Sequence, residues 1–322
     1  MKDRNASLDI LRIVACLAVI MIHTAGSPLG HHMVEEGTLW YNECLVLAAI
    51  SRWAVPVFAM ITGYFMLDSN RELSIKKLFA KYILRLVIAL VFWSIFYTLT
   101  LYGPLYPFGV QEAHFWYVGM CIGLYLSMPI MRLIAQHKNI LTFFCWTWLG
   151  IMLYQFLGHF VTLPVTIDRS IYAEFVGYCM WAYYLKSIAL KKSVREIMYV
   201  VGMLGLIVSG IMSVLTQNVD SVWVGYGAPN VIATAMAVFI AGSHHEIHVS
   251  QPIQRIITEI SQCTFGIYMV HMWVLVQIFF RAHRFVQEPL MLCFLCVFMV
   301  FAIGGGISLI IRRIPVVGKY VV

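Results

Sequence analysis

Long apolar stretches recur along the whole chain and are separated by short polar segments. Most of them approach the ~20 residues that an α-helix needs to cross ~30 Å of hydrocarbon. We expect ten spans, at residues 8–26, 45–67, 78–101, 114–134, 140–158, 172–190, 196–216, 228–243, 264–281 and 289–311. The pattern therefore predicts an all-α polytopic membrane protein with a single transmembrane domain over residues 1–322.

The composition agrees with this prediction. Of the 322 residues, 61% are hydrophobic and 11% are charged, and the mean hydropathy is +0.83. Soluble proteins carry about 25% charged residues. The first apolar stretch contains Arg12 and His23 and has no small-residue cleavage site after it, so we interpret it as the first span and not as a signal peptide.

Lysine and arginine predict the orientation, because cytoplasmic loops of membrane proteins are enriched in them. If the amino terminus is cytoplasmic and the spans alternate, 18 of the 22 basic residues fall on the cytoplasmic side. Those that fall outward are Arg52, Arg169, Arg281 and Arg284. Both termini are then cytoplasmic. The net charge of +7 reflects topology, so we expect contacts with membrane lipid and none with nucleic acid. The oligomeric state is left open.

Ionisable residues inside the first span are the first candidates for chemistry. Arg12 and His23 are eleven residues apart, close to three helical turns, which places them on nearly the same face about 16 Å apart along the axis. Asp9 precedes Arg12 by three residues and can pair with it. Such groups must face a polar cavity or a partner. The alternative is that Arg12 is an interfacial anchor and His23 lies at the outer interface.

Several motifs resemble those of the acyltransferase-3 family of integral membrane acyltransferases. The first is Arg12-x10-His23 in the first span. The second span reads Ser51-Arg52-x-x-Val55-Pro56-Val57-Phe58-x-x-Ile61-Thr62-Gly63-Tyr64-Phe65 and is similar to the family's Pro-Phe run, with Thr62 where Ser is more usual. Two later segments also match, His114-Phe115-Trp116-Tyr117 and Phe265-Gly266-Ile267-Tyr268-x-x-His271.

The resemblance implies an O-acyltransferase of the bacterial cytoplasmic (inner) membrane. Such enzymes move an acyl group, usually acetyl from cytoplasmic acetyl-CoA, to a hydroxyl of a cell-envelope polysaccharide or its lipid-linked precursor. Within the family, the chain resembles enzymes that acetylate enterobacterial common antigen and related glycans. We expect His23 to be the general base, because a near-neutral imidazole suits removal of a hydroxyl proton. Arg12 is then catalytic or binds the CoA phosphates.

Other residues have weaker predicted roles. Arg52 could bind an acidic group of the substrate or form an internal ion pair. His114, Trp116 and Tyr117 could contact the acceptor or form an aromatic belt. Tyr268 and His271, three residues apart, could share a face in the ninth span as a substrate site.

Two further groups concern the donor and the base. The basic residues at the start of the third span could bind acyl-CoA or reflect orientation alone. They are Lys76, Lys77, Lys81 and Arg85. A carboxylate partner of His23 could be Glu35, Glu36, Glu43, Glu112, Asp168 or Glu174. We expect no metal, because the histidine clusters at 31–32 and 244–248 lie in predicted loops without a paired ligand motif.

A transporter is the competing function. Intramembrane Arg and His, Pro56 and the glycines at 304–306 would also suit a pathway for a small molecule such as an amino acid. A flippase for a lipid-linked glycan is a further alternative. Binding of CoA discriminates these functions, since a transporter has no use for it.

Overall fold

The computed structural model describes residues 6–31, 33–102, 113–165 and 171–322, and this part of the chain is helical with no strand. It contains nine helices or helix pairs that are long and apolar enough to cross a membrane. Their bounds are Ala6–Gly30, Leu39–Met66, Ile75–Leu101, Trp116–Gln136, Lys138–Leu157, Lys192–Thr216, Val222–His244, Gln251–His283 and Pro289–Arg313. The predicted span at 172–190 is α8 (Ile171–Ser187), a helix of 17 residues that packs inside the bundle. The predicted fold class is confirmed.

Two spans differ from the prediction. The expected span at 45–67 begins earlier and consists of α2 (Leu39–Ile50) and α3 (Ala54–Met66), separated by a turn at residues 51–53. The expected span at 264–281 is part of α11 (Gln251–His283), whose 33 residues extend roughly 50 Å. Polar residues at the start of α11 hide its length from a hydropathy pattern.

The remaining helices complete the bundle. In chain order they are α1 (Ala6–Gly30), α4 (Ile75–Lys77), α5 (Leu84–Tyr97), α6 (Trp116–Gln136), α7 (Lys138–Leu157), α9 (Lys192–Thr216), α10 (Pro229–His244), α12 (Pro289–Arg313) and α13 (Val317–Val321). Short π-helical segments flank α5 at Leu78–Ile83 and Thr98–Tyr102, and single 3-10 turns lie at Ala113–Phe115 (η3) and Val222–Val224.

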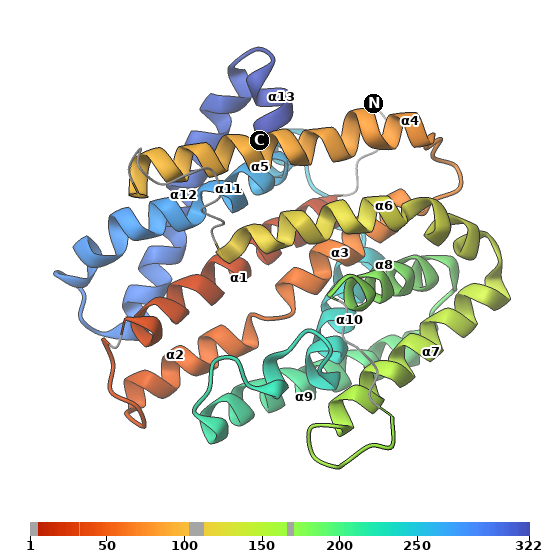
Figure 1. The fold of residues 1–322 in the computed structure, drawn as a ribbon, viewed down its shortest axis with the longest axis horizontal. Helices are drawn as coiled ribbons and strands as arrows, with labels where there is room; N and C mark the ends of the chain where they lie inside the picture. Colours follow the sequence, from red (N-terminus) through yellow and green to blue (C-terminus); the bar gives the residue numbers. More distant parts are fainter. Residues whose placement is uncertain (1–5, 32, 103–112, 166–170) are drawn as a thin grey trace.

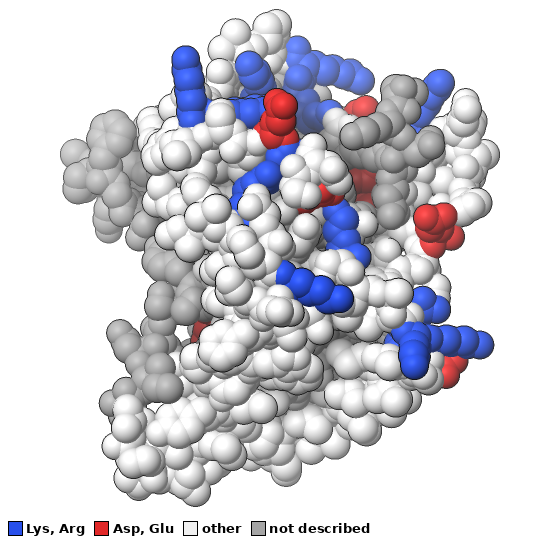
Figure 2. Space-filling model, turned by 90° about the vertical axis from the view of Figure 1, so that its right-hand side faces the viewer, with Lys and Arg blue, Asp and Glu red and all other residues white. Residues whose placement is uncertain are grey.

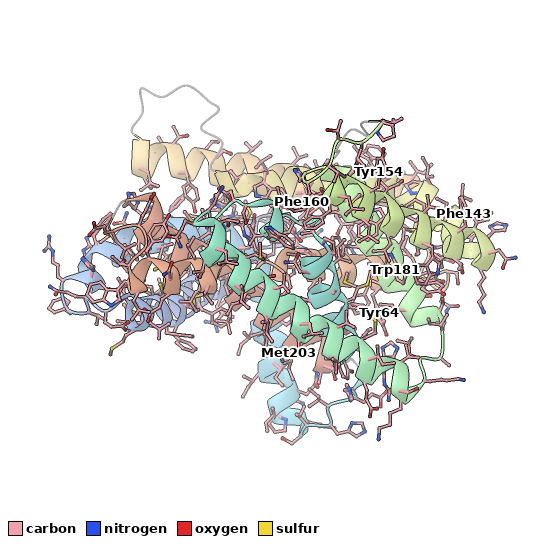
Figure 3. The ribbon with its side chains drawn as sticks, turned by 90° about the horizontal axis from the view of Figure 1, so that it is seen from below. Tyr64, Phe143, Tyr154, Phe160, Trp181 and Met203 are labelled. Carbon is pink, nitrogen blue, oxygen red and sulfur yellow. The ribbon has the colours of Figure 1, made fainter. Side chains whose placement is uncertain are left out.

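The outside of the bundle is apolar. Phe143 on α7 is 71% exposed and Met203 on α9 also projects outward, whereas Trp181 on α8 is buried (Figure 3). Exposed apolar patches of this extent are unusual on a soluble protein. They are expected where the surrounding solvent is lipid, as the hydropathy of the helices indicates.

Helix α1 occupies the centre of the bundle and packs against α2, α3, α10, α11 and α12 (Figure 1). At Gly63, α3 packs closely against the main chain of α8. A Cβ atom there would lie 2.3 Å from the carbonyl oxygen of Cys179 on α8, so only glycine fits. The glycine of the second-span motif is therefore explained by packing.

Basic side chains gather at one end of the bundle, which we call the basic end: the start of α1, the α3–α4 loop, the α8–α9 loop and α13. Figure 2 shows Lys and Arg over the upper half and right edge of the view, and its lower left is almost free of charge. Arg132 at the end of α6 donates to the carbonyls of Met66, Asp68 and Arg71 at 2.7, 3.1 and 2.8 Å. Lys186 donates to Asp68 at 2.7 Å, and this bond lowers the pKa of the Asp68 carboxyl.

Candidate active site

Three histidines from distant parts of the chain meet inside the bundle. His23 lies on α1, His114 on η3 and His271 on α11. The ring centroids of His23 and His271 are 5.0 Å apart, those of His114 and His271 are 5.0 Å apart, and those of His23 and His114 are 6.5 Å apart. His114 and His271 are buried and His23 is half-buried. The structure thus brings together three of the residues that the sequence singled out.

Tyr268 is hydrogen-bonded to two members of this histidine cluster, His114 and His271. The Nδ1 atom of His271 lies 2.5 Å from the Tyr268 carbonyl oxygen, and the Tyr268 hydroxyl donates to the His114 carbonyl. Because a carbonyl only accepts, Nδ1 of His271 carries the proton, and Nε2 is left with its lone pair. This Nε2 is buried and has no hydrogen-bond partner among the described residues. His271 is therefore held in a tautomer that can accept a proton.

No carboxylate of the described residues is hydrogen-bonded to His23. Of the six predicted partners, Glu112 and Asp168 lie outside the described residues. The ring next to His23 is the neutral imidazole of His271. Among the described residues, the ionisable neighbour of His23 is therefore another histidine, where the sequence suggested a carboxylate. The spacing of the two histidines in the sequence does not predict this contact.

A cavity of about 690 Å³ opens at the basic end and extends toward the histidine cluster. Four cationic side chains line it, Arg12, Arg85, Arg312 and Lys319, and no Asp or Glu side chain lies among the described lining residues. This volume falls within the roughly 300–1,000 Å³ of sites for drug-sized ligands. Because the charged side chains that line this hollow are all positive, it attracts an anionic ligand.

The arginines of this basic cavity are held in defined positions. The Arg12 guanidinium is 3.5 Å from Asp9 and lies over the Phe65 ring at 5.1 Å. Asp9 is only 2% exposed and accepts from Ser261 at 2.7 Å, which ties α1 to α11. Charge and packing together hold Arg12 at the cavity wall, and its role in catalysis or CoA binding stays a prediction.

Two more cations come from elsewhere in the chain. Arg85 donates to the main-chain oxygen of Val322 at 2.8 Å and lies over the Phe265 ring at 5.5 Å. Arg312 at the end of α12 donates to Gln262 on α11. The segment after α12 then forms a wall of the cavity, which brings Lys319 to its rim.

The basic cavity meets the histidine cluster at a pair of tyrosines. Tyr117 lines the cavity, and its ring centroid is 5.1 Å from that of Tyr268. The Tyr268 ring is in turn 5.4 Å from His271 and 5.8 Å from His114. This aromatic pair thus connects the wall of the cavity with the histidine cluster.

Other predicted site residues do not line the basic cavity. Arg52 donates to the Val219 carbonyl at 2.8 Å and to Asp220 at 3.0 Å, which is the internal ion pair anticipated as its alternative role. Trp116 packs with Phe175 and Tyr226, each with ring centroids 5.8 Å away. Lys76, Lys77 and Lys81 are exposed and do not line the basic cavity, so their predicted role in binding acyl-CoA stays a prediction.

The lining residues that were not predicted as site residues include Gln262, Arg312 and Lys319. Arg312 and Lys319 follow the last span, where the positive-inside bias already accounts for basic residues. The structure adds that the chain folds back through α13 and places both residues in the lining of the cavity. No group of three or more His, Cys, Asp or Glu side chains among the described residues is placed to hold a metal ion.

In the described residues, a helical bundle holds a cationic cavity, and Tyr268 beside the cavity-lining Tyr117 contacts the histidine cluster. Residues 5–309 match the family model described as "Acyltransferase domain", and the chain belongs to this acyltransferase-3 family. No curated protein and no solved structure matches the chain. The recognition made from the sequence motifs is confirmed, and the chain is a multi-pass membrane acyltransferase.

Proposed function

We propose that this protein is an O-acyltransferase that moves an acetyl group from cytoplasmic acetyl-CoA to a hydroxyl of a cell-envelope polysaccharide or its lipid-linked precursor. The observation that carries the proposal is the junction of the basic cavity with the histidine cluster. One end of this junction suits the phosphate groups of a CoA ester. The other end supplies the bases that a hydroxyl nucleophile needs.

The donor would enter from the basic end. The positive-inside rule supports a cytoplasmic location for that end, in a bacterial inner membrane. Arg12, Arg85 and Arg312 present guanidinium groups, which suit phosphate by charge and by their fork of donors. The thioester would then lie near Tyr117, next to the histidines.

The reaction would use the histidines as proton carriers. His23 removes the proton as the acceptor oxygen attacks the thioester carbonyl carbon. The new C–O ester bond forms, the C–S bond breaks, and the proton passes from the imidazolium to the departing thiolate of CoA. His271, with its free Nε2, supports His23 by sharing this proton across the 5.0 Å between the rings. A tautomer set in advance costs no reorganisation during the reaction.

The family match favours this enzyme over the transport alternatives, because transport of an amino acid or a glycan needs no acyl donor. Arg52, which would suit a substrate pathway, is engaged by Asp220 and Val219 instead. The break between α2 and α3 therefore lies beside an ion pair within the protein.

The test compares a strain without the gene with the same strain carrying the wild type, His23→Ala or the control His137→Ala. His137 is an exposed histidine at the end of α6, outside the cluster. We expect His23→Ala to lower the O-acetyl content of the surface glycan and the release of CoA from acetyl-CoA in isolated membranes by about 100-fold or more. His137→Ala should match the wild type. Equal glycan acetylation with and without the gene would contradict the proposal.

A further inference from the structure

A second, smaller pocket lies at the other end of the same two helices. It has a volume of about 220 Å³, and its walls include Pro28 of α1, Trp40 of α2, Phe279 and His283 of α11, Gln287 and Pro289. This volume is below the roughly 300–1,000 Å³ of sites for drug-sized molecules, so it suits one small ring. We call it the far pocket.

The far pocket continues the line formed by the basic cavity and the histidine cluster. Along α1 the order is Arg12, His23 and Pro28, and along α11 it is Phe265, His271 and Phe279. Pro28 lies five residues beyond His23, about 7.5 Å of helix rise, and Phe279 lies eight residues beyond His271, about 12 Å. The pocket is therefore on the side of the histidines opposite to the donor.

The lining of the far pocket combines a flat aromatic face with polar atoms. The Trp40 side chain is 48% exposed although it stands over the pocket. The Nδ1 atom of His283 is buried and has no hydrogen-bond partner among the described residues. A buried polar atom without a hydrogen-bond partner is unfavourable, and a ligand hydroxyl would supply that partner.

This combination fits a sugar ring. The C–H face of a pyranose packs on an aromatic ring, and its hydroxyls bond to nitrogen and amide groups such as those of His283 and Gln287. A lipid tail would use the apolar walls but would leave the His283 nitrogen unpaired. An aromatic belt accounts for an exposed tryptophan at a membrane interface, but it does not account for the unpaired imidazole beside it.

We propose that the far pocket binds a sugar ring of the acceptor next to the ring that is acetylated, so that the acceptor is a glycan of at least two rings. This inference rests on the proposed function. The distance supports it, because a ring in the pocket is displaced from His23 and is not the one whose hydroxyl reacts. The pocket would hold the glycan in register, so that one hydroxyl reaches the histidine cluster.

The test uses the full-length protein in lipid nanodiscs and the surface glycan of its host strain. The glycan is de-O-acetylated with mild base and cut into single sugars and into oligosaccharides of two or more rings. Binding is measured by saturation-transfer NMR titration for the wild type and for Trp40→Ala, Trp40→Phe, Phe285→Ala and His23→Ala. Phe285 is a matched control, because it is 88% exposed beyond the end of α11 and does not line the pocket.

We expect the wild type to bind the oligosaccharides at least about tenfold more tightly than the single sugars, equivalent to about 1.4 kcal/mol. Trp40→Ala should abolish this preference, whereas Trp40→Phe should keep most of it because a ring remains. Phe285→Ala should bind like the wild type, and His23→Ala should keep the preference for oligosaccharides because the far pocket is unchanged. If Trp40→Ala does not fold, as judged by its thermal unfolding midpoint, His283→Leu serves the same comparison.

Two outcomes would overturn the inference. The first is an unchanged preference for oligosaccharides in Trp40→Ala, or in His283→Leu if Trp40→Ala does not fold. The second is a wild type without any preference for oligosaccharides. If His23→Ala abolishes glycan acetylation at the same time, the proposed function stands and only the far pocket is wrongly assigned. If His23→Ala acetylates the glycan like the wild type, the proposed catalytic role fails whatever the sugar titrations show.

Discussion

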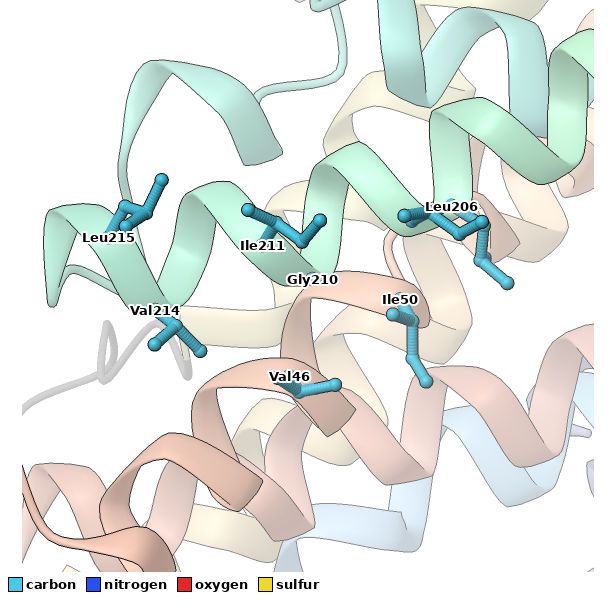
Figure 4. Close-up of a pocket in the computed structure, with 8 residues that line it drawn as sticks. Val46, Ile50, Leu206, Gly210, Ile211, Val214 and Leu215 are labelled. Carbon is cyan, nitrogen blue, oxygen red and sulfur yellow. The ribbon is translucent and has the colours of Figure 1, made fainter.

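Two hollows in this protein have opposite linings. The basic cavity of about 690 Å³ carries four cations and leads to buried histidines. A groove of about 440 Å³ between α2 and α9 is lined only by aliphatic side chains and glycine, such as Ile50, Gly210 and Ile211 (Figure 4). The side chains on its two walls face one another, and none of those that line it has a polar atom.

The difference teaches which hollows of a membrane protein indicate chemistry. An apolar groove on the outside of the bundle is filled by lipid tails at no energetic cost, so its existence needs no functional reason. Charged and unpaired polar groups inside the membrane are costly and persist where they serve a purpose. Lining chemistry, and not volume, therefore separates the candidate active site from the rest of the surface.

We expect the largest loss of activity from His271→Ala, which tests whether the lining of the basic cavity and its histidines carry the chemistry. Because Nε2 of His271 is the available acceptor beside His23, its removal should lower CoA release in membranes by about 100-fold. The double variant His23→Ala/His271→Ala should lose little more than either single variant, since residues that act as one unit are not additive. A rate for His271→Ala within threefold of the wild type would remove His271 from the mechanism.

An intermediate effect is expected from Arg312→Gln. A hydrogen bond to a charged group is worth about 1.5–3 kcal/mol, so loss of one phosphate contact should raise the KM for acetyl-CoA roughly 10- to 100-fold. The effect should shrink as salt concentration rises, because ions screen the remaining cations.

The matched control is Lys76→Gln, which removes an exposed cation that does not line the basic cavity. Its KM should stay within twofold of the wild type. A larger rise for Lys76→Gln than for Arg312→Gln would show that the donor phosphates bind at the α4 lysines, as the sequence alone suggested, and not in the cavity.

The sequence predicts the architecture and the centre of the site for a physical reason. The hydrocarbon layer of a membrane has a nearly fixed thickness, so each spanning helix needs an apolar stretch of similar length. Most spans can therefore be located from the hydropathy of the sequence alone. Polar residues within those spans stand out because lipid excludes them, and this is how His23, Arg12 and His271 were found. The family motifs added His114 and Tyr268. These two residues are more than a hundred positions apart in the sequence, so no spacing rule predicts their hydrogen bond.

What the sequence missed depends on contacts between distant segments. Arg312 and Lys319 reach the cavity only because the chain returns after α12. The partner of Arg52 lies in the loop after α9, where Asp220 is 80% exposed and has no pattern that marks it. The break between α2 and α3 also escaped notice, because residues 51–53 interrupt the apolar run with only two polar positions.

The smallest effect is expected in the apolar groove, from Ile211→Ala. Its side chain is already half exposed, and lipid replaces the lost contacts, so activity should stay within twofold and the thermal unfolding midpoint should hardly move. Gly205→Ala on the same helix makes a useful contrast, because its Cβ would lie 2.5 Å from the Asn230 carbonyl oxygen and overpacking costs about 1–3 kcal/mol. The midpoint in detergent should therefore fall for Gly205→Ala alone. If Ile211→Ala instead lowered acetyl transfer as much as Arg312→Gln, the groove would bind part of a substrate, and the lipid portion of the acceptor would be the group with the matching chemistry.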